Sequence, residues 1–237
     1  MQVFTNERLI RSQARVGRIA ATSGLVILLI GMFVSFIPRW ILVSFVALVS
    51  GLFLSTIGIT VAHRWIKEPR ADQLLVNGLK GLDDRHRLYH YLLPAEHLLL
   101  SPYGLFVLTV RRQEGEIRCQ GERWHQAFRW RRFLGGLGEE RLGNPTRENR
   151  RDVEMMQRWL DRLLPDMEVP MEGIIVFTHA GAKLTVVDSP IPVMSIKKLK
   201  SFLRGASKRD KKIPEELRME LGRALDGEVA ESQGVRE

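Results

Sequence analysis

The residues between Arg123 and Phe133 have side chains that could bind a polyanion. Four arginines and four aromatic residues share this short segment: Arg123, Trp124, Phe128, Arg129, Trp130, Arg131, Arg132 and Phe133. Guanidinium groups neutralise phosphates and aromatic rings stack on unpaired bases, so the segment could bind single-stranded nucleic acid. It could equally dock on an anionic bilayer surface. The third interpretation is structural, with the rings packed on the core and the arginines in solvent.

A second basic segment lies near the C-terminus. Residues 197–212 contain one acidic residue, Asp210, and eight basic ones: Lys197, Lys198, Lys200, Arg204, Lys208, Arg209, Lys211 and Lys212. This pattern is typical of a patch that binds nucleic acid or a membrane surface. It is also what a solvated helix face running into a loose tail would show.

The histidines, the cysteine and the glycines give little evidence of a catalytic or metal site. His86 and His90 are four residues apart, but no HExxH motif or Cys and Asp cluster completes a metal site, so we expect packing or surface roles. The single cysteine, Cys119, excludes a disulfide scaffold and has no catalytic neighbour. No Walker loop, Rossmann glycine fingerprint or Gly-x-Ser-x-Gly elbow is present, which argues against common nucleotide enzymes and hydrolases.

Apolar residues are concentrated near the N-terminus. The chain of 237 residues has a net charge of +9 and a mean hydropathy of −0.09, yet Ile19–Ile37 and Ile41–Ala62 contain no charged residue. Each stretch is about 28–33 Å long as a helix, which matches a bilayer core of roughly 30 Å. Pro38, Arg39 and Trp40 between them suit a turn at the headgroups. We therefore predict a transmembrane hairpin over residues 19–62, in preference to a signal peptide or two buried core helices.

The flanking charges predict how the hairpin is oriented. Basic residues surround both ends of the hairpin, whereas Arg39 stands alone in its turn; the flanking ones are Arg8, Arg11, Arg15, Arg18, Arg64, Lys67 and Arg70. By the positive-inside rule, both termini are cytoplasmic, in a cell membrane (an inner membrane) crossed twice. No ionisable residue lies within either span, so the hairpin is expected to anchor the protein to the bilayer and not to transport.

Small residues in the two spans are spaced for helix packing. Gly24 and Gly31 are seven residues apart in the first span, and Ala47, Gly51 and Ser55 follow every fourth position in the second. Such spacing lets helix backbones approach closely. Packing within one hairpin is the simpler interpretation, and association of hairpins into a homo-oligomer is the alternative.

The remaining residues predict an α/β domain with a mixed central sheet flanked by helices. The boundaries are a basic segment over 1–18, the domain over 63–204 and a charged tail over 205–237 with one weak helix near 213–225. The expected helices are 71–82, 144–164 and 195–203, the last capped by Ser195. The expected strands are 105–110 and 173–177 in the centre, 116–120 at an edge, and short ones near 87–93, 96–101, 183–187 and 191–194.

The order of motifs from Ala71 to Phe177 resembles the nuclease-related domain (NERD), a branch of the restriction-endonuclease-like PD-(D/E)XK superfamily. The resemblance rests on the following sequences: Glu96-His97 before a strand, the turn Ser101-Pro102-Tyr103-Gly104, the strand Leu105–Val110, Gly115, Gly121, Trp124, Asn144-Pro145 before a helix, and Ile175-Val176-Phe177. It implies a metal-dependent nuclease fold, in which two carboxylates hold Mg²⁺ or Mn²⁺ and a lysine helps to activate water.

This chain departs from that pattern at the positions that would carry the chemistry. Glu96 replaces the aspartate that opens the strand, Thr109 replaces the second carboxylate, and Arg111 replaces the lysine; Glu148 replaces a glutamine, and Asp72 is the candidate for the leading acid. A threonine cannot supply an anionic ligand, and an arginine stays protonated. The resemblance therefore implies a degenerate site, with Glu96 and Glu148 as the remaining candidate metal ligands.

These observations favour a membrane-anchored NERD-like protein that binds nucleic acid or a protein partner without cutting it, and that needs no cofactor. The first alternative is a nuclease that uses Mg²⁺ or Mn²⁺ at a migrated site, with Glu148 or Glu114 supplying the missing carboxylate. The second alternative is a structural or assembly protein of the membrane. Candidate binding residues for nucleic acid or the membrane surface are Arg123, Trp124, Arg129, Trp130, Arg131, Arg132, Lys197, Lys198 and Lys200.

Overall fold

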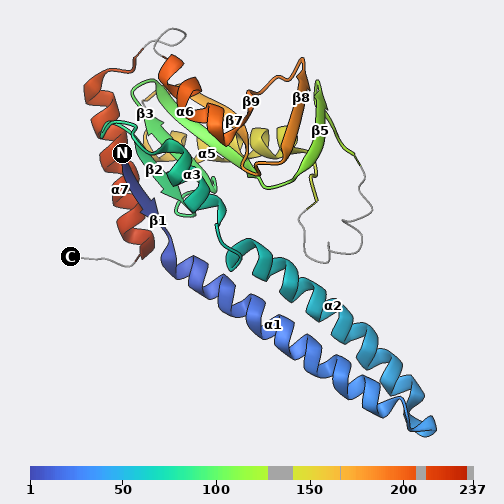
Figure 1. The fold of residues 1–237 in the computed structure, drawn as a ribbon. Helices are drawn as coiled ribbons and strands as arrows, with labels where there is room; N and C mark the ends of the chain where they lie inside the picture. Colours follow the sequence, from blue (N-terminus) through green and yellow to red (C-terminus); the bar gives the residue numbers. More distant parts are fainter. Residues whose placement is uncertain (128–140, 166, 207–211, 234–237) are drawn as a thin grey trace. The chain divides into compact units, whose positions relative to one another are not determined.

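The computed structural model describes residues 1–127, 141–165, 167–206 and 212–233. It divides into two compact units. One is a helical hairpin over Glu7–Arg70, and the other is a domain formed by Met1–Asn6, Ala71–Ala127 and the residues after Arg141. The hairpin is thus inserted into the domain sequence, between its first strand and its first helix (Figure 1).

The hairpin consists of α1 (Glu7–Val34) and α2 (Ile41–Trp65), joined by a 3₁₀ turn, η1 (Pro38–Trp40). Both helices are long and apolar enough to cross a membrane. Small residues bring them together: a Cβ added at Gly24 would lie 2.4 Å from the Ser55 nitrogen, and one at Gly58 would lie 2.2 Å from the Ala21 nitrogen. The prediction that the small residues pack the hairpin against itself is confirmed.

The larger sheet is mixed, as predicted. Its strand order is β1-β2-β3-β4-β7-β9. The antiparallel pairs are β2 with β3 and β3 with β4, and the remaining neighbours are parallel. The strands are β1 (Gln2–Thr5), β2 (Arg87–His90), β3 (His97–Ser101), β4 (Gly104–Arg111), β7 (Met171–Phe177) and β9 (Val193–Ser195).

A smaller sheet contains β6 (Arg123–Gln126), β5 (Gly115–Gln120) and β8 (Ala182–Val187), in that order. The predicted edge strand over 116–120 is therefore a central strand, because β8 pairs with its second side in parallel. Sequence alternation showed only that one face of β5 is buried, and it could not reveal a partner about sixty residues away.

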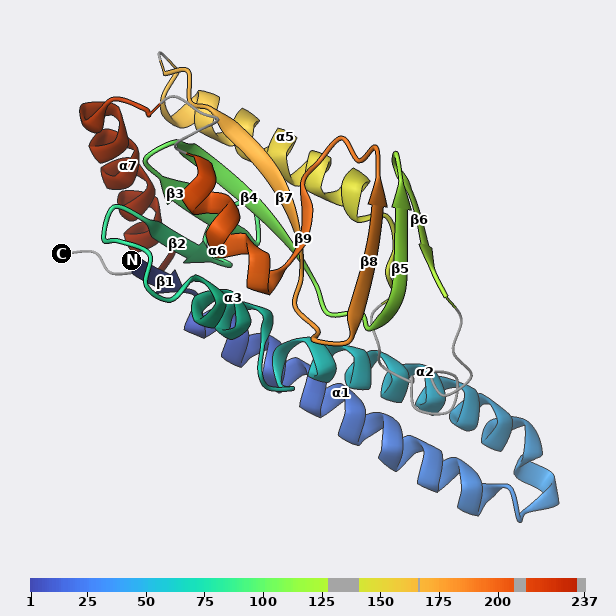
Figure 2. The ribbon, with the colours of Figure 1, turned by 45° about the horizontal axis from the view of Figure 1, so that its top comes forward.

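Helices cover both faces of the larger sheet (Figure 2). On one face, α3 (Ala71–Leu79) and α6 (Ile196–Gly205) pack against each other and close a cluster that includes Leu75, Phe106 and Leu199. On the other face, α5 (Pro145–Leu163) and α7 (Glu215–Gln233) close a cluster that includes Leu98 and Val107. Successive strand residues alternate between the two clusters, as the pleat requires.

The helices begin where the sequence predicted them, and one predicted cap is not formed. Asn144 caps α5, because its side-chain oxygen accepts a hydrogen bond from the Arg147 amide at 3.0 Å. Ser195 precedes α6 but makes no side-chain capping bond, so the prediction of a serine cap is wrong. The backbone of Ser195 instead pairs with β7, which fixes its orientation as the last residue of β9.

Two segments predicted to lie outside the domain belong to it. Residues 2–5, within the predicted basic segment 1–18, form the edge strand β1 beside β2, and Phe4 stacks on Tyr89 with ring centroids 5.1 Å apart. Residues 215–233, within the predicted tail 205–237, form α7. Its Leu221 and Leu225 are fully buried, and Asp226 accepts hydrogen bonds from Arg87 at 2.6 Å and Tyr89 at 2.8 Å.

Candidate functional site

Three of the predicted site residues share one face of the sheet. Glu96 directly precedes β3, and Thr109 and Arg111 lie on β4. The β3–β4 register pairs Leu98 with Val107, so its continuation sets Glu96 opposite Thr109. Alternation along the strands puts these residues on the face covered by α5. The fold therefore brings the predicted positions on β3 and β4 together beneath the first half of α5.

Thr109 is held by an amide that the motif comparison did not include. Asn149 on α5 is fully buried, and its Nδ2 donates to Thr109 Oγ1 at 2.9 Å and to the Val107 carbonyl at 3.0 Å. A Cβ at Gly173 on β7 would lie 1.7 Å from Asn149 Oδ1, so the glycine makes room for this amide. Neutral groups that hydrogen-bond to each other therefore fill the position of the second carboxylate.

Arg111 forms a buried ion pair with Glu148. Its side chain is 8% exposed, and Nη2 donates to Glu148 Oε2 in the first turn of α5. The Glu148 side chain is half exposed. A carboxylate engaged by a guanidinium has less capacity to ligate a dication, because both cations compete for the same oxygen. The guanidinium of Arg111 thus engages Glu148, which is one of the two remaining candidate metal ligands.

Asp152, one turn after Glu148 on α5, completes the cluster and was missed in the sequence. Burial, together with the nearby charges of Glu96 and Glu148, raises the pKa of Asp152 to about 6, against the opposing effects of Arg111 and Arg151. These interactions place the carboxyl of Asp152 near Glu96, Glu148 and Arg111. The signal available in the sequence was the four-residue spacing of Glu148 and Asp152, which sets them on one helix face.

A family model for the nuclease-related domain (NERD) matches residues 66–178. Residues 66–178 of the chain therefore correspond to a nuclease-related domain. No curated protein and no solved structure matches the chain. The matched residues include Glu96, Thr109, Arg111 and Glu148, whereas β1, the hairpin, α6 and α7 lie outside them.

The NERD site does not fit a divalent cation. Within the described ranges, no group of three or more His, Cys, Asp or Glu side chains is arranged to hold a metal ion. Glu148 is paired with Arg111, and Thr109 is bonded to Asn149. Mg²⁺ and Mn²⁺ prefer several anionic oxygens, and this donor set offers an arginine and an amide in their place.

Asp72 does not join the cluster of carboxylates. It is buried in the first turn of α3, and α3 covers the face of the sheet opposite α5. Asp72, the candidate for the leading acid, therefore lies apart from Glu96, Thr109 and Glu148. Glu114, the other candidate for a migrated carboxylate, follows β4 and lies 3.7 Å from His179 Nε2. It forms a separate pair.

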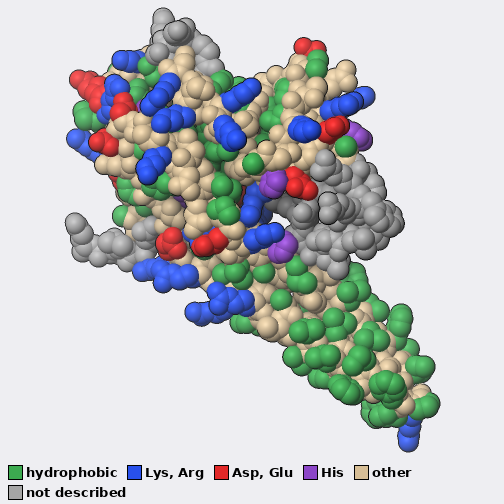
Figure 3. All heavy atoms as spheres, viewed as in Figure 1, with side chains coloured by type: hydrophobic (Ala, Val, Ile, Leu, Met, Phe, Trp, Pro, Cys, Tyr) green, Lys and Arg blue, Asp and Glu red, His purple; other side chains and the backbone are tan. Residues whose placement is uncertain are grey.

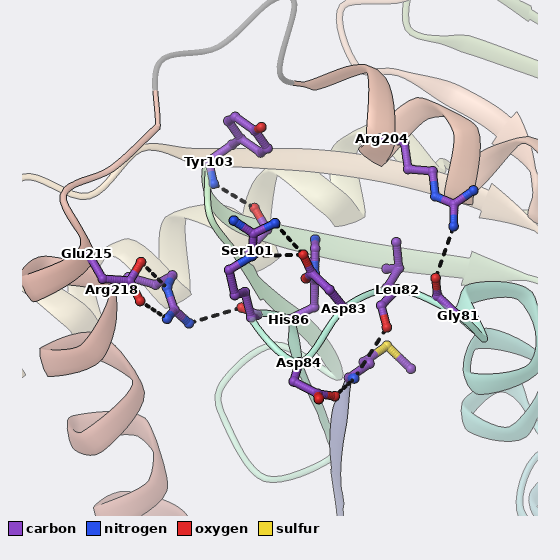
Figure 4. Close-up of polar contacts among 12 residues, drawn as sticks. Gly81, Leu82, Asp83, Asp84, His86, Ser101, Tyr103, Arg204, Glu215 and Arg218 are labelled. Carbon is purple, nitrogen blue, oxygen red and sulfur yellow. Dashed lines mark hydrogen bonds and ion pairs between the residues drawn. The ribbon is translucent and has the colours of Figure 1, made fainter.

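The histidines and the cysteine have structural partners. His86 Nδ1 lies 2.5 Å from Asp83 Oδ1 in the link between α3 and β2 (Figure 4). Burial lowers the pKa of His86, and the contact with Asp83 opposes this shift. His90 and His97 are buried opposite each other on β2 and β3, with their Nδ1 atoms 2.8 Å apart. Burial raises the pKa of Cys119, which fits an inert thiol.

The arginine-aromatic segment is only partly described. Trp124 packs against Phe177, with ring centroids 5.8 Å apart, and its Nε1 donates to Thr146 Oγ1 at 2.8 Å. This tryptophan therefore has a structural role, and Arg123 beside it on β6 is exposed. The other members of the segment, Phe128, Arg129, Trp130, Arg131, Arg132 and Phe133, lie outside the described residues.

The second basic segment is described at its start. Lys197 and Lys198 are exposed on α6, whereas Lys200 donates to the Lys80 carbonyl at 2.5 Å and Arg204 to the Gly81 carbonyl at 3.0 Å. Lys212 is exposed. Lys208, Arg209 and Lys211 lie outside the described residues.

An arginine-lined hollow adjoins the NERD site. Its volume is about 490 Å³, and it is lined by Asn144, Arg147, Glu148, Arg150, Arg151 and Glu154. The three arginines lie on adjacent turns of α5, and Arg150 also pairs with Glu122 at 2.5 Å. Glu148 belongs both to this hollow and to the ion pair with Arg111. The hollow therefore connects the degenerate site to a surface suited to anionic ligands.

The raised pKa of Asp152 predicts a pH-dependent gain of stability in the Asp152→Asn variant. The pKa of the Asp152 carboxyl is about 6 in the folded protein, against a usual value of 3.8. The folded state therefore holds this proton more tightly than the unfolded state. The resulting stabilisation is fully present below about pH 4 and is lost as the pH rises through 6. An asparagine does not titrate. We expect the variant to gain about 1–2 kcal/mol relative to the parent between pH 4 and pH 8. Urea unfolding of the full chain in nanodiscs at each pH measures this.

Glu154→Gln is the matched control, because Glu154 is exposed on the same helix. Its effect on the free energy of unfolding should be small and nearly constant across the same range of pH. An equal pH dependence in both variants would contradict the assignment to Asp152.

Proposed function

We propose that this protein is a membrane-anchored, non-catalytic nuclease-related domain that binds the phosphate backbone of nucleic acid. The hairpin would hold it in a cell membrane with both termini in the cytoplasm. The observation that carries the proposal is the ion pair of Arg111 with Glu148 beside the Thr109–Asn149 hydrogen bond. A threonine stands where nuclease chemistry needs the second carboxylate, and an arginine paired with Glu148 stands where it needs a tuned lysine.

The arginine-lined hollow supports the choice of ligand. Arg150 is paired with Glu122, and the guanidinium groups of Arg147 and Arg151 beside it present forked donors, which suit the oxygens of phosphodiesters. Binding of this kind recognises the backbone and carries little sequence preference. Its affinity should fall steeply with salt, because each neutralised phosphate releases a counterion.

Charge reversal within the hollow tests this binding. We expect Arg147→Glu with Arg151→Glu to weaken binding of a labelled oligonucleotide by about tenfold or more at low salt, and to reduce the slope of log K against log salt. Fluorescence anisotropy with the full chain in detergent measures both. Arg158→Glu with Arg162→Glu is the matched control, because these arginines lie on α5 beyond the hollow.

The alternative is a nuclease with a migrated site, and one observation favours it. Asp152 is a third carboxylate beside Glu96 and Glu148, and its raised pKa is typical of groups at functional sites. In that case Arg111 would have to release Glu148 when metal and substrate bind. Cleavage that depends on Asp152 and on Mn²⁺ would support this alternative and contradict the non-catalytic proposal.

A further inference from the structure

A basic face covers α6 and the end of α3. Its members are Lys80, Lys197, Lys198, Lys200 and Arg204, of which all but Lys200 are exposed. Figure 3 shows several Lys and Arg side chains over this part of the domain. The sequence of α6 contains no acidic residue, and the one acidic residue of α3, Asp72, is buried. The uncompensated charge of this face makes it a binding surface for an extended anion.

Backbone contacts fix part of this face and leave its start free. Lys200 donates to the Lys80 carbonyl and Arg204 to the Gly81 carbonyl, just after α3, which ties the two helices together. Figure 4 shows the contact of Arg204 with Gly81. Among the described residues, the ammonium groups of Lys197 and Lys198 make no hydrogen bond or ion pair; the Lys198 carbonyl accepts a hydrogen bond from Ser201. These two ammonium groups are therefore available to an external ligand.

The domain is joined to the hairpin at two points by short connections. Only Asn6 separates β1 from α1, and residues 66–70 separate α2 from α3. Asn6 is itself fixed within the domain, because its amide donates to the His90 carbonyl at 3.1 Å and its Nδ2 to the Tyr91 carbonyl at 3.1 Å. If the hairpin spans a bilayer, these connections keep the domain within a few residues' length of the headgroups.

The exposed lysines lie along the edge of the sheet from which the chain leaves for the hairpin. β1, β2, β4, β7 and β9 all run in one direction, so their carboxyl ends share an edge. Asn6 follows β1 at this edge, and Ile196, the first residue of α6, follows β9 there (Figure 2). Lys197 and Lys198 therefore lie at the same carboxyl end of the sheet as Asn6, with β1 and β9 as its two outermost strands.

We infer that Lys197 and Lys198, with the basic face behind them, contact anionic lipid headgroups of the bilayer that the hairpin spans. This inference rests on the proposed membrane anchor. A lipid surface fits better than nucleic acid here for two reasons. The short connections raise the effective concentration of headgroups at this edge. The one aromatic residue of α6, Phe202, packs against the core and offers no surface on which a base could stack.

The test compares the full chain in nanodiscs of zwitterionic lipid with nanodiscs in which one third of the lipid is anionic. A fluorophore is attached to the Ser201→Cys variant, because Ser201 is exposed on α6. Its fluorescence is quenched when it approaches a quencher attached to the lipid headgroups. Cys119 is buried and should not react with the label. We expect quenching about twofold stronger with anionic lipid, and loss of that increase at high salt. Lys197→Glu with Lys198→Glu should also abolish it. Arg158→Glu with Arg162→Glu, of equal charge change on the opposite face, should not.

The outcomes separate this inference from the proposed anchor. Failure of the chain to incorporate into nanodiscs contradicts the anchor and, with it, this inference. Incorporation with equal quenching in both lipids contradicts the headgroup contact alone. Binding of an oligonucleotide that depends on Lys197 and Lys198, without any response to anionic lipid, also overturns the inference and assigns the face to nucleic acid.

Discussion

Arg111→Met is expected to lower the free energy of unfolding by about 2–3 kcal/mol at neutral pH. The change leaves Glu148 without its ion-pair partner and removes a positive charge that lies near Asp152. Breaking a fully buried ion pair costs about 3–5 kcal/mol, and the half-exposed Glu148 reduces that cost. Urea unfolding of the full chain in nanodiscs measures the loss.

The same variant should gain a response to divalent cations. With the guanidinium removed, Mn²⁺ can approach the carboxylates, so millimolar Mn²⁺ should recover part of the lost stability in Arg111→Met and leave the parent unchanged. Arg150→Met is the control, because Arg150 pairs with Glu122 at the surface and should cost about 1 kcal/mol or less. Equal stabilisation of the parent and Arg111→Met by Mn²⁺ would show that the Arg111 guanidinium does not keep Mn²⁺ away from the carboxylates.

Removal of β1 is expected to destabilise the domain by about 3–5 kcal/mol. A chain that begins at residue 63 loses the strand that covers one edge of β2, together with the stacking of Phe4 on Tyr89. Burial of one phenylalanine contributes about 1.5–3 kcal/mol, and the strand hydrogen bonds add to it. Hydrogen exchange at the β2 amides measures the loss directly, since these amides should exchange faster without their partner.

A hairpin deletion that retains β1 provides the comparison. Glu7 and Arg70 lie at the two ends of the hairpin with their side chains 3.8 Å apart, so a short linker can join residue 6 to residue 71. We expect this chain to keep the β2 protection of the full-length protein. Equal protection in the chain that starts at residue 63 would show that β1 is dispensable.

The sequence predicted those elements whose signals are local. The uncharged stretches after Ile19 and Ile41 gave the hairpin, and the apolar run Leu105–Val110 and the Asn144-Pro145 start gave β4 and α5. It missed β1 because four residues next to a long helix have no periodicity of their own. It missed the extent of α7 because charged residues dilute the apolar positions Leu221, Leu225 and Val229, which are buried against β3 and its neighbours.

The site was predictable in its positions and not in its interactions. The motif order placed Glu96, Thr109, Arg111 and Glu148, and the fold brings them to one face. Pairing of Arg111 with Glu148 depends on the rotation of α5 over the sheet, which no local pattern encodes. Asn149 and Asp152 became visible only once that helix face was known, because their partners lie on strands far away in sequence.

The most direct test of the central claim is a cleavage assay with the full chain in nanodiscs. Mn²⁺ or Mg²⁺ is added with single-stranded DNA, double-stranded DNA or RNA, and the products are resolved on a gel. We predict no cleavage above that of the Glu96→Ala variant, because Thr109 stands where a cation would need the second carboxylate and Arg111 engages Glu148. Cleavage by the parent that Glu96→Ala or Asp152→Asn abolishes would contradict the account and establish an active nuclease.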